Sequence, residues 1–224
     1  MYQNTMIREQ KVNTFITQTY WWVVLGLIIT AIASYLPVAS MAVYTFLFGS
    51  SIPFTFIVIT IAMIVLAAVM ASKVSDLSFG TLLVLYIVFT VLTGLVVSVV
   101  HFAYAPMIIT EAFAITIFVF LVMAIIGTVT KKDLTRMGSI LSMILFAVII
   151  VSIVNFFIGA AFVDYVICWV VVLLFIGLTA ADAQKLKEYA QYGQNYSILG
   201  AVQLYLDFIN LFLRILMIYA KAKK

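Results

Sequence analysis

Charged residues are scarce in this sequence. Only 9% of the 224 residues are Asp, Glu, Lys or Arg, whereas 67% are hydrophobic. A soluble globular domain has roughly a quarter of its residues charged, so this composition excludes one and is typical of a polytopic helical membrane protein. The net charge of +4 comes from 12 basic and 8 acidic residues, most of which lie between the apolar runs. It therefore indicates membrane orientation, and nucleic acid is not implied as a partner.

Cysteine and catalytic motifs are also scarce. The single Cys168 lies inside an apolar run, which excludes a disulfide framework and a cysteine metal cluster. The sequence has no Ser/His/Asp set, no phosphate-binding glycine loop and no zinc-ligand spacing. Two membrane aspartates are typical of intramembrane aspartyl proteases, but those need a glycine-flanked GxGD turn, which the GLTAAD segment does not supply. We therefore expect neither an enzyme nor a bound cofactor.

Seven apolar segments of nearly bilayer length follow one another along the chain. A bilayer core needs about 20 apolar residues per helix, and the backbone groups of that helix must bond to one another. We therefore predict one all-α domain over 1–224, with a cytoplasmic segment at 1–19 and a basic tail at 220–224. A cleavable signal is the alternative for the first segment, but the six that follow favour a retained helix. The predicted spans are 20–35, 54–71, 79–100, 111–129, 137–158, 163–181 and beyond, and 199–219.

Basic residues predict the orientation of these spans. With a cytoplasmic N-terminus, the positively charged side falls inside and the opposite loops carry no Lys or Arg. The cytoplasmic basic residues are then Arg8, Lys11, Lys73, Lys131, Lys132, Arg136, Lys185 and Lys187. The tail is the exception, because its lysines lie outside if the seventh helix crosses the membrane. Two alternatives follow: this helix crosses fully, which its length favours, or it re-enters and returns.

A polar stripe marks the last apolar segment as an interior helix. Lipid penalises an exposed carboxylate or guanidinium by roughly 2.5 to 3.5 kcal/mol, so such groups face protein or a wet cavity. We therefore predict that the last helix is central in the bundle. Arg214 lies two turns from Asp207 and is expected to face a neighbour or to extend toward the interface. The stripe, at steps of three or four residues, is Gly200, Gln203, Asp207, Asn210 and Arg214.

A second acid is placed to meet this stripe. Asp182 lies about eight residues before the predicted turn at 191–197, and Asp207 about eight after it, so both are expected at one depth on neighbouring helices. Two carboxylates in a poorly solvated place cannot both ionise cheaply and are expected to share a proton. Their doubly ionised form suits Ca²⁺, with which protons would compete. In the alternative, Asp182 caps the loop and Asp207 forms a structural ion pair with Arg214 or Lys73.

Three segments of the sequence are distinctive: GTVTKKDLTRMGSIL (127–141), FIGLTAADAQKLK (175–187) and LYLDFINLFLRIL (204–216). Together they resemble the Bax inhibitor family of seven-helix membrane proteins, in its bacterial branch. The resemblance implies a last helix wrapped by six others and a pH-sensitive calcium leak channel in the bacterial cytoplasmic membrane, with Ca²⁺ transported and H⁺ regulating. It also implies a gate made by an aspartate pair on the last two helices, which falls on Asp182 and Asp207.

The resemblance is incomplete at two further positions. The nearest match to the family's arginine latch near the end of the second span is Lys73. A lysine lacks the bidentate fork of arginine, so we expect the latch to be weaker or absent. Glu111 is the nearest candidate for the family's pore glutamate, although an acid there also suits a helix N-terminus. Asn210 and Arg214 are further candidates for the pore or its mouth. The alternative functions are a non-conducting regulator that binds a membrane protease or other membrane partner, and a proton-coupled cation antiporter.

Overall fold

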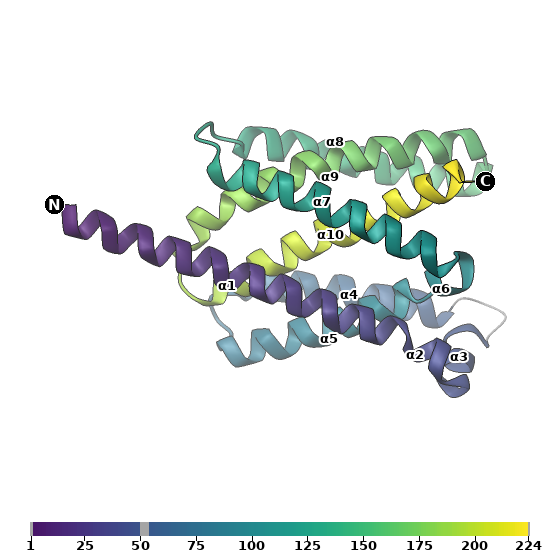
Figure 1. Cartoon of the computed structure of the whole chain (residues 1–224). Coiled ribbons are helices and arrows are strands. Elements are labelled where there is room, and N and C mark those ends of the chain that lie inside the picture. Colours follow the sequence, from purple (N-terminus) through teal and green to yellow (C-terminus); the bar gives the residue numbers. More distant parts are fainter. Residues whose placement is uncertain (1, 50–53, 224) are drawn as a thin grey trace. The chain divides into compact units, whose positions relative to one another are not determined.

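The structure, a computed structural model, describes residues 2–49 and 54–223, without the side chains of residues 2–5, 7 and 8. Arg8 and Lys224, which enter the predicted charge bias, thus lie outside the described side chains. Every regular element in the described ranges is a helix (Figure 1). The helices are α1 (Tyr2–Ser34), α2 (Leu36–Ala39), α3 (Met41–Phe48), α4 (Phe54–Ser72), α5 (Phe79–Val97), α6 (Val100–Ala103), α7 (Pro106–Val129), α8 (Thr135–Ile158), α9 (Ala161–Tyr189) and α10 (Asn195–Ala222).

Seven helices in the described part of the chain are long and apolar enough to cross a membrane, which confirms the predicted fold class. They are α4, α7, α8, α9 and α10, together with α1 and α5 and their short continuations α2 and α6. The short α2 and α3 form in a segment that we expected to be a loop. This segment is apolar but too short to span, so its backbone groups are satisfied in short helices, and Pro37 occupies the first turn of α2.

The turn between the last two helices is shorter than predicted. α9 ends at Tyr189, and Gly193 has a φ of 109°, a left-handed conformation that glycine adopts without a steric penalty. α10 then begins at Asn195, four residues before the predicted start at Leu199. Polar side chains that we assigned to the loop therefore form the first turn of α10.

Backbone contacts divide the chain into two compact units. The first unit comprises Met1–Ala105 and Tyr189–Tyr205, and the second comprises Pro106–Glu188 and Leu206–Lys224. Residues from α10 contribute to both units. The single domain expected over 1–224 stays a prediction.

In the first unit, α5 packs against both α1 and α4. Gly94 of α5 faces the backbone of α1 so closely that a Cβ would lie 2.7 Å from the carbonyl oxygen of Thr30. Thr30 donates a hydrogen bond to the Thr90 carbonyl (3.0 Å), and its hydroxyl also contacts that of the buried Tyr205. The small Gly94 and the hydrogen bonds of the Thr30 hydroxyl thus hold α1, α5 and the first half of α10 together, as expected for membrane helices.

The start of α10 is fastened to the α4–α5 loop within the first unit. Asn195 Nδ2 donates to the carbonyls of Val74 (3.0 Å) and Leu77 (2.8 Å). The hydroxyls of Ser75 and Tyr196 lie 3.1 Å apart. These long-range contacts explain the early start of α10, because they depend on residues that are about 120 positions away in the chain.

In the second unit, glycines allow α7 and α8 to approach α9. A Cβ at Gly127 of α7 would overlap the backbone of Ala180 in α9. A Cβ at Gly138 of α8 would lie 3.0 Å from that of Ala181. Small residues thus allow α7 and α8 to approach closely the turn of α9 that precedes Asp182.

A glutamine side chain holds the α7–α8 turn (residues 130–134) against α9. Gln184 Oε1 accepts from the backbone N–H of Leu134 (2.7 Å), and its Nε2 donates to the carbonyls of Thr130 (3.2 Å) and Lys132 (2.8 Å). The side chain of Asp133 accepts from the N–H of Thr135 (2.8 Å) and so satisfies the start of α8. Backbone groups that no helix could pair are thereby satisfied.

α10 is the most buried of the seven span-length helices. Within its most apolar 18-residue window, 56% of the residues are buried, compared with 6% for α8. The predicted interior position of the last helix agrees with this burial. Its continuous 28 residues correspond to about 42 Å, longer than a bilayer core, and full crossing by α10 stays a prediction.

Candidate functional site

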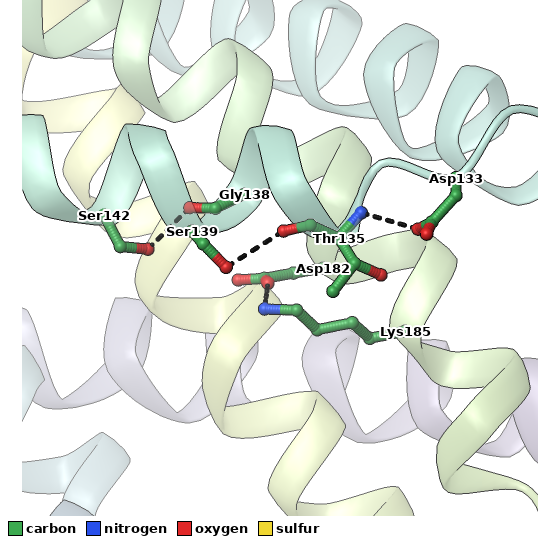
Figure 2. Close-up of polar contacts among 7 residues, drawn as sticks. All are labelled: Asp133, Thr135, Gly138, Ser139, Ser142, Asp182 and Lys185. Atoms are coloured by element: carbon green, nitrogen blue, oxygen red, sulfur yellow. Dashed lines mark hydrogen bonds and ion pairs between the residues drawn. The ribbon is translucent and has the colours of Figure 1, made fainter.

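Asp182 lies on α9 with only 9% of its surface exposed. Its Oδ1 accepts a hydrogen bond from Lys185 Nζ at 2.6 Å, an ion pair between residues one helical turn apart (Figure 2). Figure 2 also shows that the Lys185 side chain runs back along α9 to reach this carboxylate. Asp182 therefore has its own counter-ion on its own helix.

Asp207 lies on α10 and is buried more deeply, with 4% of its surface exposed. Its Oδ2 has no hydrogen-bond partner among the described residues. Asp182 and Lys185 are the charged groups that interact electrostatically with it. A buried carboxylate oxygen without a partner costs free energy when it is ionised.

Aromatic rings surround the residue next to Asp207. The Phe208 ring packs edge-on against Phe113 (5.5 Å between centroids) and Phe120 (5.4 Å), both on α7. Phe113 also packs against Phe212, one turn further along α10. We call the group formed by Asp182, Lys185 and Asp207 the acidic niche.

The structure places the two predicted aspartates in one unit. Their distances in sequence from the turn between α9 and α10 are not equal, although the prediction required them to be. Asp182 lies seven residues before the end of α9, whereas Asp207 lies twelve residues after the start of α10. The reason is the early start of α10. Lys185 is a member of the niche that was not predicted from the sequence, although its i+3 spacing from Asp182 in the DAQK segment was a usable signal.

Glu111 lies at the opposite end of α7 from the α7–α8 turn. It accepts hydrogen bonds from the Tyr219 hydroxyl and from Lys223 Nζ, both at 2.8 Å. Glu111 and Tyr219 are the two hydrogen-bonded groups that raise the pKa of Lys223. Lys221 lies over the ring of Tyr165 at 4.4 Å. Two of the tail lysines that violate the charge bias therefore have partners where the structure places them.

The two remaining stripe candidates make no contact with a carboxylate in the described residues. Asn210 Nδ2 donates to the carbonyl of Leu206 in its own helix (2.8 Å). Arg214 Nη1 lies within hydrogen-bonding distance of two sulfur atoms, those of Cys168 (3.9 Å) and Met217 (3.7 Å). The alternative in which Arg214 neutralises Asp207 is therefore not observed, and the pore roles of both residues stay predictions.

Lys73, the candidate latch, forms an exposed ion pair with Asp76 at 3.3 Å in the α4–α5 loop. Its pairing with an aspartate of the niche stays a prediction. No three His, Cys, Asp or Glu side chains converge anywhere in the described chain. A Ca²⁺ ion at the niche would therefore have two protein carboxylates, Asp182 and Asp207, with the first of them already bonded to Lys185.

The fold and the niche together define a polytopic helical membrane protein with an acidic pair in its interior. The chain belongs to the Bax inhibitor family: the family described as "Inhibitor of apoptosis-promoting Bax1" has a sequence model that matches residues 12–224. The family predicted from the three sequence segments is thereby confirmed.

Bacterial relatives match over almost their whole length. The chain is 34% identical to "Inner membrane protein YbhL" of Escherichia coli K12, over 94% of this chain and 93% of that protein. It is also 34% identical to an uncharacterized protein of Deinococcus radiodurans, over 96% and 95% of the two chains. An uncharacterized membrane protein of Streptococcus pyogenes serotype M1 is 31% identical over 93% of each chain.

Proposed function

We propose that this protein is a pH-sensitive calcium leak channel of the bacterial cytoplasmic membrane, gated by a proton at the Asp182 and Asp207 pair. Seven span-length helices and an E. coli relative described as an inner membrane protein support the location. The charge bias of the loops supports a cytoplasmic N-terminus. Ca²⁺ is the transported ion in this proposal, and H⁺ is the regulator.

One observation carries the gating proposal: the buried Asp207 has an unpartnered carboxylate oxygen and interacts with a second carboxylate. Two carboxylates in one poorly hydrated niche cannot both carry a charge cheaply, so the pair holds a proton. Lys185 compensates the charge of Asp182, which leaves Asp207 as the group on which the proton resides. Loss of that proton adds a second negative charge to the niche between α9 and α10 and changes their contacts.

The direct test is ion flux through purified protein in liposomes that contain a calcium-sensitive dye. We expect Ca²⁺ flux down its gradient that changes with pH across the titration of the pair. Asp207→Asn removes the ionisable group while keeping its size, so the flux of this variant is expected to be the same at every pH. The matched control is Asp76→Asn, because Asp76 is an exposed acid already paired with Lys73.

Three results would contradict the proposal. Flux that titrates unchanged in Asp207→Asn would exclude this aspartate as the sensor. Flux that needs an imposed proton gradient would favour an antiporter. A protein that is inert in pure-lipid vesicles but co-purifies stoichiometrically with a membrane partner would favour a non-conducting regulator.

A further inference from the structure

The α7–α8 turn presents three basic side chains that have no partner. The side chains of Lys131, Lys132 and Arg136 are exposed and form no hydrogen bond or ion pair with the described residues. Because this turn joins two helices of spanning length, it lies at the depth of the lipid headgroups. Their positive charge is therefore available to a group outside the chain.

The acid of the same turn is occupied elsewhere. Asp133 points toward the backbone of Thr135 and accepts its N–H (Figure 2), and hydrogen bonds from the Thr135 hydroxyl and N–H lower the pKa of Asp133. It stays ionised, but its carboxylate serves α8. The α4–α5 loop differs, because its Lys73 is paired with Asp76. Lys221 and Lys223, at the other end of the second unit, are also engaged, with Tyr165 and Glu111.

Two further features make this turn suited to a lipid. The three hydrogen bonds of the Gln184 side chain fix the backbone of the turn, so the turn loses little conformational entropy when a ligand binds. Large apolar side chains next to the turn are exposed as well, with 71% of Val129 and 44% of Ile140 accessible. A molecule with an anionic head and apolar tails would place phosphate on the cations and a tail along these residues.

We propose that the α7–α8 turn binds the phosphate headgroup of an anionic phospholipid through Lys131, Lys132 and Arg136. The partner is a lipid rather than free phosphate, because the cations stand directly beside a lipid-facing apolar surface. Since Gln184 joins the turn to α9 two residues from Asp182, a bound lipid also restrains the helix that carries the acidic niche. The binding itself does not depend on whether the protein conducts ions.

The test uses the full chain in detergent and dioctanoyl phosphatidylglycerol, with dioctanoyl phosphatidylcholine as the zwitterionic probe. Binding is measured by native mass spectrometry and by the increase in melting temperature. We expect phosphatidylglycerol to bind more tightly than phosphatidylcholine, and the triple variant Lys131→Gln, Lys132→Gln, Arg136→Gln to lose about tenfold or more in that affinity. The preference is also expected to weaken at high salt, which screens exposed charges.

Two variants separate this site from general charge effects. The double variant Lys221→Gln, Lys223→Gln removes two engaged cations from the same unit and is expected to keep the phosphatidylglycerol preference. Gln184→Ala keeps every charge but releases the turn, so it is expected to bind phosphatidylglycerol more weakly than the wild type. Melting temperatures without lipid show that each variant is folded.

Three outcomes would overturn the proposal. The first is equal binding of the two lipids. The second is an unchanged preference in the triple variant while the double variant loses it, which would place the site on the tail. The third is inorganic phosphate at millimolar concentration producing the same stabilisation as phosphatidylglycerol, which would define a free-anion site.

Discussion

α8 and α10 have similar lengths but opposite surroundings. α8 has a mean hydropathy of 2.8 and buries 6% of its apolar window, whereas α10 has a mean hydropathy of 1.6 and buries 56%. In a soluble protein the more apolar helix would be the more buried one. In a bilayer the solvent is itself apolar, so polar side chains are driven into the protein and the most apolar helix is left to the lipid.

The comparison also locates the chemistry of the protein. α10 carries the carboxylate of Asp207, the amide of Asn210 and the guanidinium of Arg214, each of which would be costly against lipid. The buried residues of α8 are Gly138 and Asn155 alone, one near each end. α10 is therefore held by buried side chains along its length, whereas most side chains of α8 stay exposed.

The largest difference between the two helices is expected from matched truncations. Leu211→Ala removes a fully buried side chain of α10 and leaves a cavity, so it is expected to lower the free energy of unfolding by roughly 2 kcal/mol. Ile150→Ala on α8, where the side chain is 50% exposed, is expected to change it by less than about 0.5 kcal/mol. Denaturation in mild detergent measures both. Equal losses would show that burial does not distinguish the helices.

A smaller effect is expected where α8 is attached to α9. Asn155 Nδ2 donates to Asp164 Oδ1 at 2.5 Å and to the Ala160 carbonyl at 3.3 Å, so it joins the end of α8 to the start of α9. Asn155→Leu is expected to cost about 1 kcal/mol of unfolding free energy. Ser152→Ala is the control, because Ser152 bonds only within its own helix. A variant as stable as the control would mean that α8 needs no polar attachment.

The smallest effect is expected at the C-terminal end of α10. Lys223→Gln removes the ion pair with Glu111, which is partly exposed, so the melting temperature should fall only slightly at neutral pH. Because the pKa of Lys223 is raised in the folded protein, its contribution is fully present below the unfolded pKa and is lost as pH rises through the folded pKa. The difference between wild type and variant should therefore vanish at strongly alkaline pH. A difference that persists there would contradict the ion-pair explanation.

The sequence was sufficient for the number of spans and for the interior position of α10. Hydrophobic runs of bilayer length define helices almost regardless of their neighbours, and the stripe of polar residues showed which helix could not face lipid. The exact start of α10 could not be predicted, because it depends on hydrogen bonds from Asn195 to carbonyls of the α4–α5 loop. Such contacts between distant segments leave no local pattern.

The two aspartates of the candidate site were predicted from the sequence, but its lysine was not. Asp182 and Asp207 were selected because carboxylates are rare in apolar segments, and both are buried. Lys185 was read as a loop cation that orients the protein, whereas the structure pairs it with Asp182. Charge counting treats every lysine alike, so it could not distinguish a bound lysine from a free one such as Lys131. The same limit applies to Lys221 and Lys223, whose partners lie on other helices.

The low hydropathy of α10 also affects its insertion into the membrane, because α10 is the last of the helices to be synthesised. Of the seven segments it is the one that would leave the translocon for lipid least readily, and it emerges after α7 and α9, whose side chains cover its second half. α10 can therefore enter the membrane against protein surfaces that are already in place. If this segment were the first to be synthesised, its carboxylate and guanidinium would enter the bilayer with no protein surface to cover them.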